Sequence, residues 1–177
     1  MNATAMAIGI AVAALGAWWP LGAAGDDSVP PARAGAIAEL RYDTTPGKPM
    51  ELAREGEPAE RIVARRDGGR FVLEVARNVG KQYETGRAAL TEAEWRALEK
   101  VVADHALAKW RARPTGNQAF DYSSSGFSIR AAGGKTINEQ HWSQPAADEQ
   151  QPGALAAALG ALAKAKVAAP RLFYFGY

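Results

Sequence analysis

The chain has 177 residues, which is long enough for one domain with a sizeable hydrophobic core. It contains no cysteine, and this excludes a disulfide scaffold, a thiolate nucleophile and a cysteine-ligated zinc site. Its 21 basic and 19 acidic residues nearly balance at a net charge of +2, so the composition does not indicate a nucleic-acid-binding protein.

The N-terminal stretch, residues 1–25, carries no charged side chain, and small residues precede the first charge at Asp26. This pattern predicts a secretory signal peptide and a periplasmic or secreted protein. The lack of a Lys or Arg before the apolar run departs from the signal-peptide pattern. Because the uncharged run is long enough to approach a bilayer span, an uncleaved inner-membrane anchor formed by residues 1–25 is an alternative, and a cytosolic protein is a third. Residues 26–36, with Pro30 and Pro31, predict an exposed linker.

The remaining residues, 37–177, are predicted to form a single α+β domain. Apolar and polar residues alternate from Ile37 to Tyr42, which predicts a first strand. Residues 44–60 are rich in Pro, Gly and charge and predict a long loop. Loops of this length are often functional, but a poorly ordered insertion is an equal alternative.

A first hairpin is predicted for residues 61–66 and 70–77, because Asp67-Gly68-Gly69 separates two alternating segments. Phe71, Leu73 and Val75 share one face of its second strand. Four arginines cluster on this hairpin: Arg61, Arg65, Arg66 and Arg70. They either bind an acidic partner or lie in solvent at the ends and on the outer face of the hairpin. Residues 78–89 predict a connection or a short extra strand.

A central helix is predicted for residues 90–110. Thr91 and Glu94 have the spacing of a capping box, and Leu90 and Trp95 that of a hydrophobic staple. Glu92 and Arg96 are placed to form an i,i+4 ion pair. An apolar stripe at three- and four-residue spacing predicts the buried side, formed by Trp95, Leu98, Val102 and Ala106.

A second hairpin is predicted around Gly133-Gly134, with Phe127 and Ile129 in its first strand and residues 136–142 in its second. A polar loop, residues 143–151, follows. Pro152 then suits the first turn of a helix, whose apolar stripe is Leu155, Leu159 and Leu162 and which Pro170 ends. The aromatic tail, residues 171–177, predicts an edge strand, a segment packed on the last helix, or an exposed binding patch.

The order is therefore strand, hairpin, helix, hairpin, helix and tail. It predicts an antiparallel sheet built from two hairpins and covered on one face by two helices.

The sequence offers few candidates for catalysis. His105 and His141 are not in a metalloprotease spacing, and no metal site or cofactor is predicted. Ser123 to Ser125 lack the first glycine of the Gly-x-Ser-x-Gly elbow, and nothing in the sequence places a base beside them. Asp121 and Glu139 flank the second hairpin, but paired carboxylates gain meaning only from their separation. No catalytic, cofactor-binding or metal residue is therefore assigned.

The segment from Leu90 to the strand at Phe127 is similar to emfourin-type small protease inhibitors. The matching positions are Leu90, Leu98, Val102, Asp121 and the Gly133-Gly134 turn, and the resemblance covers about half of the chain. It implies a protein that occludes a metalloprotease cleft through a loop edge. The loop at 44–60 and the tail at 171–177 depart from that pattern, and no inhibitory residue is carried over.

The sequence thus favours an exported, non-enzymatic binding domain with a protein partner, such as a protease inhibitor, an immunity-type protein or an envelope accessory protein. Two alternatives stay open. One is a small hydrolase that uses a serine of residues 123–125 with His141, and the other is a membrane-tethered structural protein.

Overall fold

The protein is described by a computed structural model that covers residues 37–45, 52–114, 123–143 and 146–168. The predicted signal peptide or anchor at 1–25, the linker at 26–36, Asp121 and the tail at 171–177 lie outside these residues. No helix in the described part of the chain is long and apolar enough to cross a bilayer.

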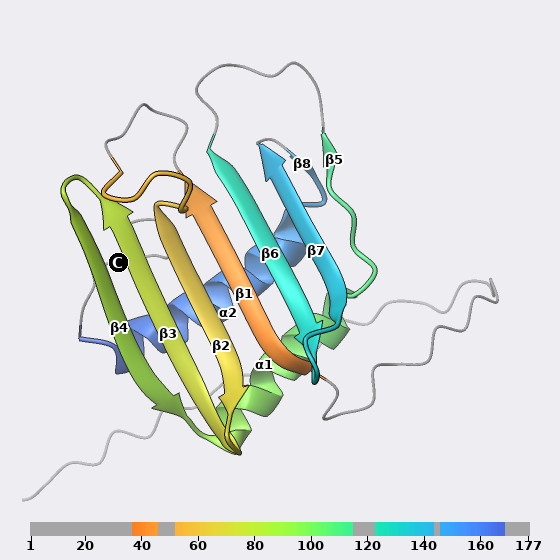
Figure 1. Ribbon diagram of the computed structural model, residues 1–177. Helices are drawn as coiled ribbons and strands as arrows, with labels where there is room; N and C mark the ends of the chain where they lie inside the picture. Colours follow the sequence, from red (N-terminus) through yellow and green to blue (C-terminus); the bar gives the residue numbers. More distant parts are fainter. Residues whose placement is uncertain (1–36, 46–51, 115–122, 144–145, 169–177) are drawn as a thin grey trace, which may run out of the picture.

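The architecture is α+β, with a six-stranded antiparallel sheet in the order β4-β3-β2-β1-β6-β7 and two helices (Figure 1). The main strands are β1 (Ile37–Thr45), β2 (Glu60–Asp67), β3 (Arg70–Val79), β4 (Gln82–Leu90), β6 (Ser124–Ala131) and β7 (Thr136–Ser143). The helices are α1 (Glu92–Asp104) and α2 (Gln150–Lys166). Two short strands, β5 (Arg113–Pro114) and β8 (Ala146–Ala147), pair separately.

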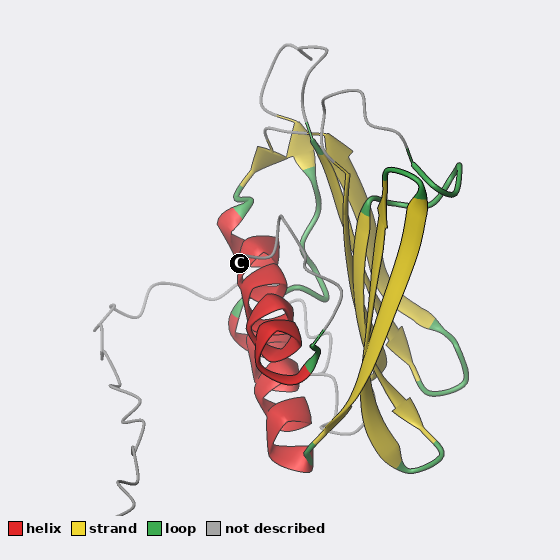
Figure 2. Ribbon diagram, turned by 90° about the vertical axis from the view of Figure 1, so that its left-hand side faces the viewer, coloured by secondary structure: helices red, strands yellow, loops and turns green. Residues whose placement is uncertain are grey.

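The core lies between the sheet and the helices. Helix α2 packs on β1, β2 and β3, and α1 packs on α2. Figure 2 shows the sheet nearly edge-on, with both helices packed beside it. The predicted stripes supply Trp95, Leu98 and Val102 from α1 and Leu155 and Leu159 from α2, all of which are buried.

The capping box at the start of α1 is confirmed. The Glu94 N–H donates to the Thr91 hydroxyl at 3.2 Å, and the Thr91 N–H donates to Glu94 Oε2 at 2.7 Å. The predicted pair between Glu92 and Arg96 is also present, at 2.6 Å.

The central helix is shorter than predicted. It ends at Asp104 rather than near Trp110, and Ala106, predicted to be buried, is exposed with a positive φ of 49°. This left-handed residue turns the chain, so that Leu107 and Trp110 enter the core in its place. At the other end, Leu90 closes β4 and lies outside the helix.

The first hairpin is part of a three-stranded meander, because residues 82–90 form a strand, β4, as in the second of the two alternatives for this segment, and it is a full strand rather than a short one. The β2–β3 turn consists of Gly68 and Gly69, both with positive φ, since Asp67 pairs with Arg70. The observed order is therefore strand, meander, helix, hairpin, helix, with β5 and β8 as additions.

Two predicted loops are shorter than expected. Thr44 and Thr45 extend β1 along β6, and Glu60 opens β2, so residues 44–60 are not all loop. The polar loop at 143–151 contains β8 and the first residues of α2. In both places backbone pairing extends regular structure into segments whose composition favours turns.

Candidate functional site

One side of the sheet, which we call the charged face, carries most of the strand charges. Cross-strand register places these residues on the same side: Glu39, Arg41, Asp43, Arg61, Arg65, Glu74, Arg87, Arg130, Glu139 and His141. The alternate residues of the same strands, such as Leu40, Ile62 and Leu73, are buried in the core. The period of two along each strand therefore separates an apolar side from a charged side.

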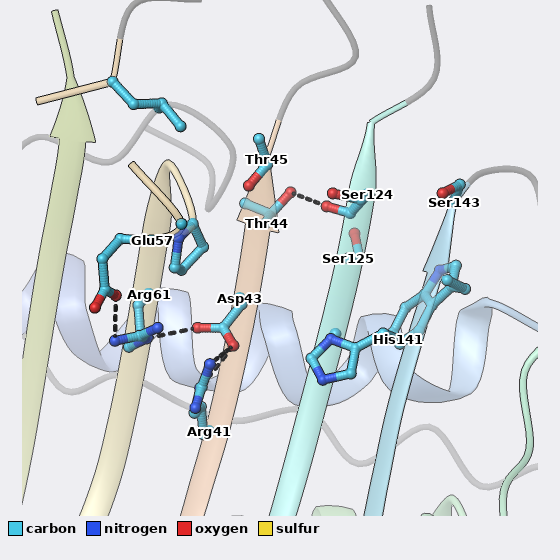
Figure 3. A pocket seen from close by; sticks show the side chains of 15 residues that line it. Arg41, Asp43, Thr44, Thr45, Glu57, Arg61, Ser124, Ser125, His141 and Ser143 are labelled. Atoms are coloured by element: carbon cyan, nitrogen blue, oxygen red, sulfur yellow. Dashed lines mark hydrogen bonds and ion pairs between the residues drawn. The ribbon is translucent and has the colours of Figure 1, made fainter. Parts of the chain in front are cut away.

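A pocket of about 530 Å³ opens on the charged face where β1 ends and β6 begins. Strands β1, β2, β6 and β7 and the loop before β2 contribute its lining. The lining residues are Arg41, Asp43, Thr44, Thr45, Leu52, Gly56, Glu57, Pro58, Arg61, Ser124, Ser125, Gly126, His141, Trp142 and Ser143. Figure 3 shows that arginines and acids occupy one wall, while His141 faces them from β7.

The charged wall of the pocket is a chain of four paired side chains. Asp43, whose side chain is only 8% exposed, accepts from Arg41 Nε at 2.6 Å and from Arg61 Nε at 2.9 Å. Arg61 Nη1 also meets Glu57 Oε2 at 2.8 Å. Burial lowers the pKa of Arg41, but the hydrogen bond and charge of Asp43 outweigh it, so its pKa is raised and the guanidinium stays charged.

Buried Asn78 fixes the loop beside this wall. Its Oδ1 accepts from the Arg54 N–H at 2.8 Å, and its Nδ2 donates to the carbonyls of Arg54 at 2.8 Å and Glu57 at 3.3 Å. The Arg54 guanidinium lies 3.6 Å above the Tyr83 ring. The loop is thus held by contacts with β3 and β4, and Glu57 is positioned to pair with Arg61.

His141 forms the opposite wall. Its ring lies over Gly126, and its Nε2 is 3.5 Å from Glu139 Oε1. Cross-strand register puts Asp43, Gly126 and His141 in one row across β1, β6 and β7. The missing side chain of Gly126 leaves the space that the imidazole occupies.

The serines of the predicted hydrolase alternative lie on both sides of the sheet. Ser125 is buried on the core side, where burial raises the pKa of the Tyr42 phenol and a hydrogen bond between Tyr42 and Ser125 partly offsets the rise. Ser124 is exposed, and its carbonyl accepts from the Thr44 hydroxyl at 3.3 Å. Within the described ranges, no hydrogen bond joins a hydroxyl of residues 123–125 to His141.

The two histidines belong to different elements. His105 is the C-cap residue of α1, and its N–H donates to the Val101 carbonyl at 3.1 Å. His141 lies in β7 at the pocket. The parts of the chain that the structure describes contain no cluster of three or more His, Asp or Glu residues suited to a metal ion.

The arginines predicted to cluster on the first hairpin are divided between the two sides of the sheet. Arg61 and Arg65 lie on the charged face, where Arg65 Nη2 meets Glu74 Oε1 at 2.9 Å. Arg66 lies on the core side, 3.3 Å from Glu99 of α1 and over the Trp95 ring. Sequence reasoning missed Asp43 and Asn78. The alternating charges of Glu39, Arg41 and Asp43 were the available signal for Asp43.

No protein-family model, curated protein or solved structure matches the chain. The function is therefore inferred from the chemistry of the pocket and of the charged face.

Proposed function

We propose that the protein is an exported, non-enzymatic binding domain that recognises a protein partner. In this proposal residues 1–25 direct export, α1 and α2 both cover the core side of the sheet, and the pocket on the charged face stays open for the partner. The partner is a protease, a toxin or an envelope component. The protein would then act, respectively, as an inhibitor, an immunity-type protein or an accessory factor.

The observation that carries the proposal is the fixed wall of the pocket. Asp43 holds Arg41 and Arg61 in place, and Asn78 holds the loop that presents Glu57. A surface that is already ordered before association loses less conformational entropy on binding, which favours recognition. Nucleophilic catalysis instead requires a hydroxyl positioned by a base, and Ser125 is bonded to Tyr42 on the core side.

Inhibition of a metalloprotease is the first partner class to test, because of the resemblance to emfourin-type inhibitors. The purified protein should be titrated into a thermolysin-type metalloprotease, with a trypsin-type serine protease as the control enzyme. A dose-dependent loss of activity in the metalloprotease alone supports the inhibitor form. Full activity of both enzymes at a large molar excess of the protein contradicts that form.

The hydrolase alternative has its own test. Ester and peptide substrates should be assayed with the wild type and with Ser124→Ala, Ser125→Ala and His141→Ala. We expect no turnover above buffer for any of the four proteins. Turnover that disappears in a serine variant and in His141→Ala would establish the enzyme and overturn the binding proposal.

Export and anchoring are separated by N-terminal sequencing of protein recovered from a periplasmic fraction. A mature start near Asp26 supports a cleaved signal peptide. An intact N-terminus in the membrane fraction supports the anchor and the membrane-tethered alternative.

A further inference from the structure

Strand β4 is an edge of the sheet that pairs only with β3 in the described part of the chain. The pairing runs along the whole strand without a register shift, so no bulge twists this edge away. No proline interrupts Gln82–Leu90. A long, regular edge exposes backbone N–H and C=O groups that can pair with another strand.

The opposite edge differs. At β7 the segment that follows α1 is tied to the strand, because Asn138 Nδ2 donates to the carbonyls of Leu107 at 2.7 Å and Trp110 at 2.9 Å. Gln140 Oε1 also accepts from the Ala112 N–H at 3.3 Å. At β4 the described residues show one hydrogen bond from outside the sheet, at one end, where Lys166 Nζ donates to the Ala89 carbonyl at 3.2 Å, while the Arg54 guanidinium lies over the Tyr83 ring. The backbone of residues 82–88 therefore forms the open part of the edge.

We propose that two copies of this chain pair through β4, antiparallel and with Thr85 opposite Thr85 of the second copy. A two-fold axis perpendicular to the sheet places side chains of the same sheet side opposite each other. Because successive residues of a strand point to opposite sides, the numbers of any two opposing residues must then add up to an even number. The open window, residues 82–88, is centred on Thr85. The pairing extends the six-stranded sheet across the two-fold axis into the second copy.

The side chains of β4 suit this register. Arg87 faces Tyr83 of the second copy, and Glu84 faces Gly86, so no two like charges are directly opposed. If the two-fold axis passed through Glu84, the Glu84 residues of the two copies would face each other, and an axis through Arg87 would do the same for Arg87. Either register would place like charges in contact. Moving the axis to Gly86 brings in Ala89 and Leu90, at the end that Lys166 occupies. The strand is thus complementary to itself, which favours a second copy over an unrelated strand.

Cross-linking tests the register directly, because the chain has no cysteine and every introduced thiol is unique. Residues directly opposite in an antiparallel pair have Cα atoms about 4.5–5.5 Å apart, within reach of a disulfide. Under mild oxidation Thr85→Cys should form a covalent dimer at least about ten times faster than Thr136→Cys, the matched control on the β7 edge. Equal rates for the two variants, or faster cross-linking of Gly86→Cys, overturn the proposed register.

Charge substitution tests the interface without cysteine. Thr85 is exposed, so Thr85→Lys should leave the fold intact while opposing two lysines across the axis. In analytical ultracentrifugation we expect the wild type and the Thr136→Lys control to dimerise alike. We expect Thr85→Lys to raise the dimer dissociation constant about five-fold or more. Mixing Thr85→Lys with Thr85→Glu should restore the dimer. A wild type that stays monomeric at the highest concentration reached, or a Thr85→Lys protein that dimerises as well as the wild type, contradicts the proposal.

Discussion

The imidazole of His141 lies so close over Gly126 that a β-carbon at position 126 would be 2.3 Å from Nδ1. This contact, between neighbouring residues of β6 and β7, lets the ring rest against the sheet and face Asp43 across the pocket (Figure 3). The histidine wall of the pocket therefore depends on the absence of a side chain at position 126.

Gly126→Ala should displace His141 from the pocket. Added volume in a packed site forces neighbouring side chains to move, at a cost of about 1–3 kcal/mol, and the exposed imidazole is the group free to rotate. The measurement is urea denaturation together with the NMR signals of the His141 ring. In a His141→Ala background the same substitution should cost less, since the two closest atoms belong to the imidazole and the next nearest, the Gln140 carbonyl oxygen, is 3.2 Å away. An equal cost in both backgrounds would show that the ring does not lie over Gly126.

Trp95→Ala should reduce the free energy of unfolding by about 3–5 kcal/mol, as expected for a large buried aromatic residue. The indole is 1% exposed, stacks on Phe71 with ring centroids 5.2 Å apart, and donates from Nε1 to Glu99 at 2.9 Å. Chemical denaturation measures the loss. Trp95→Phe is the control, because it keeps an aromatic ring in the core while it removes the hydrogen bond and part of the indole volume. A neutral Trp95→Ala would mean that α1 does not pack on the sheet through this side.

The elements that could be predicted are those with one apolar side and one polar side. Strands β1 and β3 and helix α1 alternate between apolar and polar residues with the correct period, so their existence and buried sides follow from the sequence. Strand β4 was predicted only as one of two alternatives, a connection or a short extra strand, because an edge strand buries little on either side. Its sequence, with Thr85, Gly86 and Arg87 in the middle, carries no apolar alternation. The pairing with β3, rather than local preference, makes it a strand.

The pocket could not be predicted from local patterns because its contacts join distant segments. Asp43 pairs with Arg61, which lies 18 positions away, and Asn78 binds Arg54 at a separation of 24. Only the cross-strand register brings these residues together. The end of α1 was missed for a related reason. Ala106 fits the apolar stripe of the helix, but its positive φ turns the chain out of the helix. Leu107 is buried in its place.

The capping box of α1 should make stability depend on pH. Burial raises the pKa of Glu94, but hydrogen bonds from the Thr91 N–H and from Lys166 outweigh it, so the folded-state pKa lies below the ordinary value of 4.5. The unfolded chain then binds more protons, and the contribution of Glu94 is complete above pH 4.5 and is lost as the pH falls through the folded-state pKa. Thr91→Ala should cost about 1 kcal/mol at neutral pH.

Denaturation at a series of pH values measures this dependence. Lys166→Met removes the ion pair at 2.9 Å and should make the loss of stability below pH 4.5 smaller than in the wild type. Lys100→Met removes an exposed pair with Asp104 on the same helix and is the matched control. Identical acid profiles for Lys166→Met and the wild type would contradict the assignment.

Asn78→Ala should release the loop that forms one wall of the pocket. The substitution removes the three hydrogen bonds to Arg54 and Glu57, and an unsatisfied buried backbone group costs about 1–3 kcal/mol. Hydrogen exchange at the Arg54 N–H should accelerate, while amides in β6 keep their protection, because the loop opens locally. Asn78→Asp keeps the acceptor for that N–H but loses both donors, so its effect on this amide should be smaller. If the loop is the recognition surface, Asn78→Ala should weaken partner binding by more than its loss of global stability explains. Unchanged exchange at Arg54 would show that the loop is held by other contacts, such as the stacking of Arg54 on Tyr83.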